Sequence, residues 1–304
     1  MPCYHPLQAF RTPGGKIVFK PTGLPDYQDH LEIPCGRCVG CKLERSREWA
    51  VRCIHEAQMH EENDYLTLTY RDSALPPGGT LIKKHMQDFI KRLRHHFPRK
   101  TIRYLMCGEY GEETQRPHYH MILFGIRFND RKPFKMVRGN MIFTSDRLDE
   151  IWGHGYCQVG NVTFKSAAYV ARYVLKKQTK NDKDTDRVDP ETGEIFEPRL
   201  PEYIACSLKP AIGKSWIEKY ENDVFPQDFV VIGNRQFPVP KYYRRLYADK
   251  NPEKAEEMRA KRIEKAKASP DNSSSRLATR EDIQKRRLDK LKRNQNESEN
   301  LRDT

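Results

Sequence analysis

The sequence predicts an α+β fold: a central antiparallel sheet with helices packed on one face, a Cys-rich N-terminal segment, and a charged C-terminal tail that is helical or disordered. Strand-like and helix-like segments are mixed along the chain, as is typical of this class. Two strand-like segments follow each other with only a ten-residue turn between them, which favours an antiparallel hairpin. No aromatic residue follows residue 247, so the hydrophobic core is expected to end before the tail.

The first third of the chain predicts a helix, a strand and a second helix. Residues 1–41 are rich in Pro, Gly and Cys and are expected to be irregular. Residues 42–60 carry apolar residues at helical spacing and predict a helix. Residues 65–70, Tyr-Leu-Thr-Leu-Thr-Tyr, are rich in strand formers and predict a strand. After a Pro-Gly loop, residues 81–96 predict a basic helix with one apolar side.

The middle of the chain predicts the hairpin and a further helix. Residues 102–107 and 118–124 predict strands, and residues 108–117 turn the chain between them. A polar segment follows, then a short helix near 145–151 and a strand around 156–162 that is punctuated by glycines. Apolar residues at helical spacing predict a helix over 165–178.

The remainder of the chain divides at its change in composition. Residues 179–198 are highly charged and predict a loop or insertion, and residues 199–247 regain apolar content and complete the domain. Residues 250–304 hold 16 basic and 11 acidic side chains and cannot bury enough apolar surface to offset their ordering entropy. We expect one or two solvated helices there, with a loose linker at 269–275. The predicted domains are therefore an N-terminal segment over 1–60, a central domain over 61–247 and a tail over 248–304.

The formal net charge of +13 predicts a polyanionic partner, because binding phosphates releases counterions. No window approaches the run of about 18 apolar residues that spans a membrane, and the N-terminus has no apolar run typical of a signal peptide. We therefore predict a cytoplasmic protein whose eight cysteines are thiols or metal ligands. Five cations of the basic helix are candidates for phosphate binding, or else form a solvated face: Lys83, Lys84, Lys91, Arg92 and Arg94.

His118 and His120 lie two residues apart on a predicted strand, so both imidazoles point to one face and can share an ion. Glu109 ends the preceding strand and is the expected third ligand, because a strand holds a ligand better than a turn does. Glu112 and Glu113 compete from the turn. This set suits Mg²⁺ or Mn²⁺ and leaves positions open for a phosphate oxygen. Two histidines on an exposed strand without a metal are the alternative.

Tyr169 and Tyr173 lie one turn apart on the helix predicted over 165–178, where two phenols could reach the same phosphate. Arg172, Lys176 and Lys177 flank them and would help a phenol of pKa near 10 to act as a nucleophile. A tyrosine ladder on a surface helix is the alternative interpretation. The tyrosines fall opposite an apolar stripe made of Ala167, Val170, Ala171 and Val174.

Cys35, Cys38 and Cys41 have the spacing C-x2-C-x2-C, and three nearby thiolates can converge on one ion. Tetrahedral zinc needs a fourth ligand. Cys3 is the first choice, followed by Cys53 and then His5, although Cys53 lies on a helix stripe where a buried cysteine is ordinary. The pattern predicts a structural Zn²⁺ site, with free thiols in a turn as the alternative and an iron–sulfur cluster as a further one.

Several segments together resemble a known family. Arg116-Pro-His-Tyr-His120 resembles the HUH motif, with Tyr119 where a bulky hydrophobic residue is usual. The segment from Tyr169 to Lys177 resembles the two-tyrosine motif of microvirus initiators, and residues 65–70 resemble the first strand motif of rolling-circle initiators. Residues 34–49 and 207–213 resemble elements of the gokushovirus branch. The resemblance is therefore to gokushovirus-type replication initiators of the HUH endonuclease superfamily, over residues 1–247.

The resemblance implies an HUH nuclease fold and a replication initiator that nicks the viral strand of origin DNA. Such an enzyme stays linked to the 5′ end through tyrosine and later rejoins single-stranded circles. It implies catalysis by Tyr169 and Tyr173 and metal binding by His118 and His120, in the cytoplasm of a bacterial host. The basic tail is then a candidate for contacts with DNA or host replication proteins. The alternatives are a zinc-containing DNA-binding protein without catalysis, and a plasmid initiator or transposase of the same chemistry.

Overall fold

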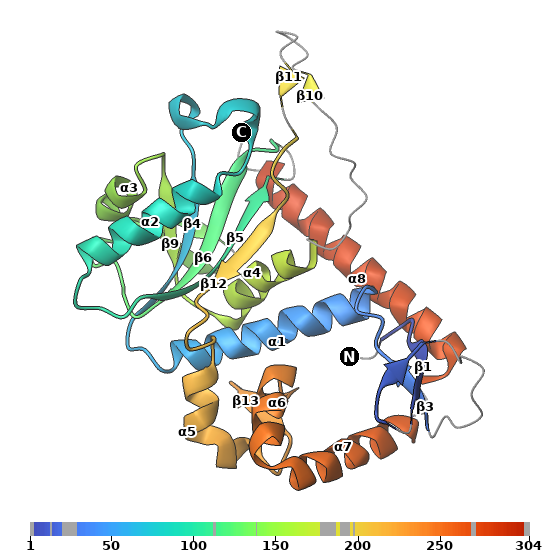
Figure 1. Ribbon diagram of the computed structural model, residues 1–304. Coiled ribbons are helices and arrows are strands. Elements are labelled where there is room, and N and C mark those ends of the chain that lie inside the picture. The colour runs from blue at the N-terminus through green and yellow to red at the C-terminus, as the bar shows by residue number, and fades with distance from the viewer. Residues whose placement is uncertain are drawn as a thin grey trace. The chain divides into compact units, whose positions relative to one another are not determined.

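The computed structural model describes the chain in Figure 1 except at a few segments. The described residues are 3–12, 14–19, 29–111, 114–137, 139–176, 187–188, 195–196, 198–268 and 272–300. The chain divides into two compact units, one formed by residues 1–45 with 251–304 and the other by residues 46–250. The domain boundaries expected from composition, after residues 60 and 247, stay a prediction.

The unit of residues 46–250 is built on a seven-stranded sheet with the order β12-β5-β6-β4-β9-β8-β7. Each neighbouring pair of strands is antiparallel, which confirms the predicted α+β class and antiparallel sheet. The strands are β4 (Asn63–Thr69), β5 (Arg103–Tyr110), β6 (Pro117–Phe124), β7 (Lys132–Val137), β8 (Asn140–Thr144), β9 (Cys157–Gly160) and β12 (Tyr203–Cys206).

Helices cover both faces of this sheet. Helices α2 (Lys83–His96) and α3 (Asp146–Trp152) pack on one face, in a core that includes Met121 and Leu123. Helix α4 (Phe164–Lys176) and the second half of α1 (Val39–Ala57) pack on the other face, with Ile122 and Phe124. Figure 1 shows α2 and α4 on opposite sides of the sheet. The expectation of helices on one face only is wrong, because the central strands are apolar on both faces and both must be buried.

The central hairpin is longer than expected. Its first strand continues through Gly108 and Glu109 to Tyr110, so the turn predicted from residue 108 begins later. Gly108 lies in the strand because it has no side chain: a Cβ there would come within 2.9 Å of Tyr203 and 3.1 Å of Tyr119. Glu109 is therefore held by a paired strand rather than by a turn.

The polar segment after the hairpin forms the β7–β8 edge of the sheet, which the sequence did not predict because β7 exposes most of its side chains. The segment predicted as a charged loop contains a short hairpin, β10 (Arg187–Val188) and β11 (Ile195–Phe196). Beyond β12 the unit is completed by α5 (Lys214–Val224), β13 (Phe229–Ile232), β14 (Arg235–Pro238) and α6 (Lys241–Lys250).

The unit of residues 1–45 and 251–304 contains a three-stranded sheet of order β2-β1-β3, made of β1 (Leu7–Arg11), β2 (Ile17–Val18) and β3 (Asp29–Ile33). The expectation that residues 1–41 are irregular is wrong, because short antiparallel strands form between the glycines and prolines. The tail forms two helices, within the one or two expected, α7 (Pro252–Lys267) and α8 (Ser274–Asn300). Residues 269–271 of the expected linker lie outside the described residues. None of the helices within the described residues is long and apolar enough to cross a membrane.

Candidate functional site

The register of three central strands brings the predicted metal ligands together. Glu109 of β5 lies directly opposite His118 of β6. His120 is two residues along β6 and lies opposite Thr67 of β4 on its other side. Because directly opposite residues share a face of the sheet, Glu109, His118 and His120 project from the same face, which α4 covers in part.

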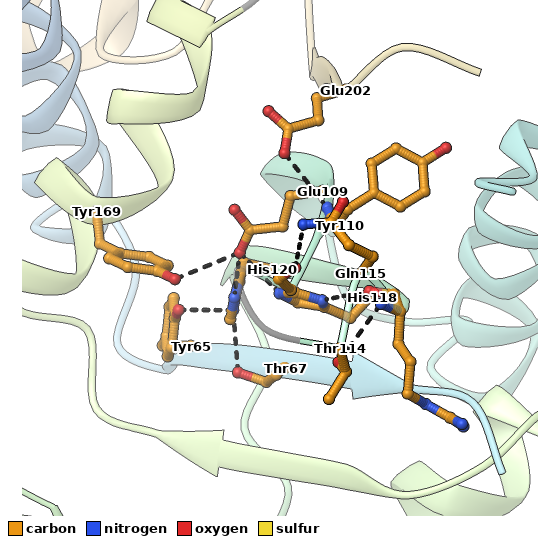
Figure 2. A network of polar contacts seen from close by, with 12 residues as sticks. Tyr65, Thr67, Glu109, Tyr110, Thr114, Gln115, His118, His120, Tyr169 and Glu202 are labelled. Carbon is orange, nitrogen blue, oxygen red and sulfur yellow. Dashed lines mark hydrogen bonds and ion pairs between the residues drawn. The ribbon is translucent and has the colours of Figure 1, made fainter. Parts of the chain in front are cut away.

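The Glu109 carboxylate contacts both imidazoles through one oxygen, as Figure 2 shows. Its Oε1 lies 2.8 Å from Nε2 of His118 and 2.7 Å from Nε2 of His120. Only 1% of Glu109 and 7% of His120 is exposed, so water screens these contacts weakly. One potential ligand atom from each residue lies within 4.8 Å of the other two, and the group could therefore hold one ion, as the sequence predicts.

A hydrogen bond to the backbone fixes the tautomer of His118, and with it the state of the nitrogen that faces Glu109. Nδ1 of His118 lies 3.1 Å from the carbonyl oxygen of Arg116, and because a carbonyl only accepts, Nδ1 must donate. A neutral His118 then turns the lone pair of Nε2 toward the Glu109 carboxylate. Two acceptors at 2.8 Å repel each other unless a proton or a cation lies between them. The donor set of this site therefore fits a divalent cation.

The charge state of Glu109 also suits a cation. Burial alone would raise the pKa of its carboxyl, but in the absence of a metal, hydrogen bonds and charge from the protonated forms of His118 and His120 hold that pKa at about 2. Its second oxygen, Oε2, is buried and has no hydrogen-bond partner among the described residues, which leaves it available to an ion. Burial lowers the pKa of His120, favouring the neutral form that binds metals.

Two residues of β4 orient His120 and were given no role from the sequence. Nδ1 of His120 lies 2.7 Å from the Tyr65 hydroxyl and 3.0 Å from Oγ1 of Thr67. Both contacts are drawn in Figure 2. Hydrogen bonds of this kind fix the ring of a metal-binding histidine and turn its other nitrogen to the ion. The sequence does contain a signal for this role. Tyr65 and Thr67 lie two residues apart on a predicted strand, so both point to one face of it, and that strand could pair with the hairpin that carries His120.

Helix α4 brings Tyr169 to the same group. The Tyr169 hydroxyl donates a hydrogen bond of 3.3 Å to Oε1 of Glu109, and its ring stands edge-on to His120 with centroids 5.0 Å apart. Ala167, Val170 and Ala171 are fully buried, as the predicted apolar stripe requires, and they fix the rotation of the helix against the sheet. Tyr169 is thus half-buried beside the candidate metal ligands.

The other residues predicted beside Tyr169 are less well described. Tyr173 and Lys176 lie in α4, one and two turns beyond Tyr169, but their side chains lie outside the described part of the chain. Lys177 lies outside the described residues altogether. Of the basic helix, Arg92 has a structural role, because its guanidinium donates to the carbonyls of Ile151 and Trp152 over 2.7 and 2.9 Å.

The sheet face that carries the histidines continues across β4 to the start of β9. The backbone nitrogen of Thr69 donates to the carbonyl of Tyr156 over 3.1 Å, so these two residues lie side by side. Gly155 makes the approach possible, since a Cβ there would come within 2.4 Å of the Thr69 carbonyl. The Tyr156 side chain is 70% exposed. Strand alternation directs it to the histidine face, because the next residue, Cys157, is buried in the core on the opposite face.

A second group of potential metal ligands lies in the other unit. Cys3, Cys35, Cys38 and Cys41 each offer a sulfur, and the four sulfurs all lie within 4.8 Å of one another. These are the four cysteines expected to converge. Cys53, the second choice as fourth ligand, is instead fully buried in the core beneath α4.

The chain is similar to known proteins over most of its length. The family model described as Replication-associated protein ORF2/G2P matches residues 63–178, the stretch that contains Glu109, both histidines and Tyr169. Replication-associated protein VP4 of Bdellovibrio phage phiMH2K is 36% identical to the chain, over 86% of this chain and 82% of the relative. Replication-associated protein ORF2 of Spiroplasma virus 4 is 31% identical, over 81% and 80%.

A third relative, Replication-associated protein ORF4 of Chlamydia phage 1, is 30% identical over 72% of this chain and 54% of its own length. No solved structure matches the chain.

Proposed function

Because the chain belongs to the family of phage replication-associated proteins, we propose that it is a rolling-circle initiator that cuts and rejoins single-stranded DNA through a tyrosine nucleophile. The observation that supports this proposal is the hydrogen bond of 3.3 Å from the hydroxyl of Tyr169, the proposed nucleophile, to Glu109, a candidate metal ligand. The relatives' names favour a phage initiator over a plasmid initiator or a transposase of the same chemistry.

Glu109, His118 and His120 would hold Mg²⁺ or Mn²⁺ with positions left for the DNA. When bound, the cation would polarise a phosphate oxygen as a Lewis acid and offset its negative charge. The chain's own residues prepare the site. Tyr65 and Thr67 contact the His120 ring, and the Arg116 carbonyl contacts the His118 ring, so the proposed ligands would be in position before DNA binds.

In the proposed reaction, the phenol oxygen of Tyr169 forms a bond to phosphorus while the bond from phosphorus to the 3′ oxygen breaks. The phenol loses its proton to solvent, and the departing oxygen takes up a proton to become a 3′-hydroxyl. The other product is a 5′-phosphotyrosine ester. Because one phosphoester replaces another, the 3′-hydroxyl of a strand can attack the ester in reverse and reseal the DNA.

Tyr173 would supply a second nucleophile. It lies four residues beyond Tyr169 on α4, a spacing at which two helical side chains are neighbours. A second tyrosine allows a new cut while the first still carries DNA. Lys176 and Lys177 are proposed to lower the phenols' pKa and to bind phosphates.

The proposed substrate is single-stranded DNA, including the strand exposed at a duplex origin, in the cytoplasm of a bacterial host. Host replication proteins are proposed partners. The exposed ring of Tyr156 would stack on a base next to the scissile phosphate, since aromatic rings bind single strands in this way without reading sequence. Arg71, exposed and hydrogen-bonded through its backbone to residue 154, would contact the DNA backbone beside it.

The test is covalent adduct formation. Full-length protein is incubated with Mn²⁺ and overlapping single-stranded oligonucleotides from the genome that encodes it, and adducts are resolved under denaturing conditions. We expect one oligonucleotide to become attached, and we expect Tyr169→Phe/Tyr173→Phe to abolish attachment. Tyr247→Phe, which removes a hydroxyl from a tyrosine stacked on Phe225, should retain it. An adduct from the double variant would refute the proposed nucleophiles. DNA binding without any adduct would support a DNA-binding protein without catalysis.

A further inference from the structure

The four cysteines of the smaller unit are arranged around a common centre. Cys3 precedes β1, while Cys35, Cys38 and Cys41 follow β3 and enter α1. All eight cysteines of the chain are free thiols, so disulfides do not account for this grouping. Gly36, with φ of 74°, turns the chain between the first two cysteines of the C-x2-C-x2-C run.

The spacing of the sulfurs fits a single ion. A zinc–sulfur bond is about 2.3 Å long, so two sulfurs on a tetrahedral zinc lie about 3.8 Å apart. The sulfurs of Cys3 and Cys38 are 3.8 Å apart, and the remaining sulfurs lie within 4.8 Å of one another. A multinuclear cluster, whose irons and sulfides lie between the cysteine sulfurs, would need more room than this.

Backbone amides point at the sulfurs as they do around thiolate ligands. The amide of Cys35 donates to the sulfur of Cys3 over 3.1 Å, and the amide of Cys38 donates to that of Cys35 over 3.3 Å. The sulfur of Cys38 accepts from the amides of Cys41 and Tyr4 over 3.5 and 3.4 Å. Such bonds stabilise negative sulfur, which favours metal binding over four neutral thiols.

Helix α8 is attached to this group. Leu277 of α8 is buried against Tyr4 and Cys38 in a small apolar cluster. One turn later, Oε2 of Glu281 lies 2.8 Å from Nε2 of His5, so His5, the other alternative as fourth ligand, is engaged by α8 instead. Tyr4 and His5 directly follow Cys3, and their positions therefore depend on what holds the Cys3 sulfur.

We propose that Cys3, Cys35, Cys38 and Cys41 bind one structural Zn²⁺, and that this ion fastens helix α8 to the N-terminal segment. Beyond Leu277 and Glu281, most described side chains of α8 are exposed, and its charged sequence gives it little other apolar surface to bury. Removing the ion would free residues 3–5, and with them the contacts that Tyr4 and His5 make with Leu277 and Glu281 of α8. The role is structural, because four protein ligands leave no position open on a tetrahedral ion.

The first test is metal content. We expect about one zinc per full-length chain purified under reducing conditions, and a loss of at least tenfold in Cys35→Ser/Cys38→Ser. Cys206→Ser, which changes a cysteine of β12 in the larger unit, should keep the metal. Zinc-free wild-type protein, unchanged zinc in the double variant, or iron in place of zinc would each overturn the proposal.

The second test is protection of α8, and it uses wild-type protein in case the cysteine variants fail to fold. Lys285, Arg286 and Arg287 are exposed sites for trypsin in α8. Withdrawing zinc with a chelator should speed cleavage there about tenfold or more, and adding zinc back should restore protection. Leu277→Ala should speed the same cleavage while retaining zinc. Cleavage that zinc does not affect would refute the link between the ion and α8. Neither result depends on DNA cleavage.

Discussion

The Tyr169 hydroxyl donates a hydrogen bond of 3.3 Å to Oε1 of Glu109, the same oxygen that contacts both His118 and His120. A strand carboxylate thus connects a helical tyrosine to two imidazoles of the neighbouring strand (Figure 2). The pairing of β5 with β6 fixes the carboxylate against the imidazoles, and the packing of α4 on the sheet brings the tyrosine. The proposed chemistry needs both contacts at once.

Replacing Glu109 should separate catalysis from DNA binding. Glu109→Gln removes the charge that attracts a cation and keeps the side chain's size. We expect the rate of adduct formation at fixed Mn²⁺ to fall about 100-fold or more, since electrostatic groups at such sites contribute on this scale. Affinity for single-stranded DNA, measured by fluorescence anisotropy without metal, should change less than about threefold. A variant that cleaves at the normal rate would show that Glu109 is not a ligand.

Tyr65 and Thr67 should affect metal binding, by holding the His120 ring, rather than DNA binding. Because both contact Nδ1 of His120, one can replace the other, and Tyr65→Phe alone should have a small effect. Tyr65→Phe/Thr67→Val should lower Mn²⁺ affinity about 10- to 100-fold, as loss of such outer hydrogen bonds does. Calorimetric titration with Mn²⁺ measures this, and excess Mn²⁺ should restore cleavage. Normal Mn²⁺ affinity in the double variant would contradict the assigned role.

Tyr156 should contribute binding energy for single strands. Its ring is 70% exposed, so removing it should leave the fold intact. Tyr156→Ala should weaken single-stranded DNA binding by about 1–3 kcal/mol, the usual contribution of one stacked base. Tyr156→Phe keeps the ring and should bind normally, which separates stacking from hydrogen bonding. Equal affinity of the Ala variant and the wild type, in anisotropy titrations at one salt concentration, would place the DNA elsewhere.

Glu56 should make the larger unit sensitive to acid. Burial would raise the pKa of Glu56, but hydrogen bonds from His60 and the Gly213 amide, with the charge of Arg103, lower that pKa below its ordinary value. Its stabilising effect is therefore complete above the unfolded pKa of about 4.3 and is lost as pH falls through the lowered folded value.

Glu56→Gln tests this assignment by denaturant unfolding at several pH values. It should cost about 3 kcal/mol near neutral pH, because Arg103 is buried and would lose its ion pair. It should also flatten the loss of stability below pH of about 4.3. Glu62→Gln is the control: its pairing with Lys100 is at the surface and should contribute about 1 kcal/mol or less. Equal effects of the two substitutions would contradict the assignment.

The grouping of Glu109, His118 and His120 was predictable from local pattern, whereas its connection to Tyr169 was not. Because side chains alternate along a strand, His118 and His120 lie on one face, and the hairpin brings Glu109 opposite His118. The contact from Tyr169 to Glu109 depends on how α4 docks across the sheet, which the apolar stripe of one helix does not specify. Spacing likewise predicted that Cys35 and Cys38 converge, but only the folded chain decides among Cys3, Cys53 and His5.

The missed elements have a common physical origin. Strands β7 and β8 lie at an edge of the sheet, where Lys132 and Phe134 face solvent and the sequence lacks the apolar run of a buried strand. The strands β1 to β3 are short and lie among glycines and prolines, so turn residues dominated the pattern. The expectation of helices on one face fails because the central strands are apolar on both faces: Leu105 and Ile122 point to the face opposite that of Met106 and Leu123, and both faces need cover.

The most direct test of the account is mapping of the covalent adduct formed with Mn²⁺ and an oligonucleotide. Trypsin cuts after Lys165, Arg172 and Lys176, so Tyr169 and Tyr173 fall on different peptides and mass spectrometry can tell them apart. We predict that nucleotides remain on the peptide of residues 166–172, through Tyr169, or on that of residues 173–176, through Tyr173. Attachment to any other residue, or cleavage without an adduct, would contradict the tyrosine mechanism.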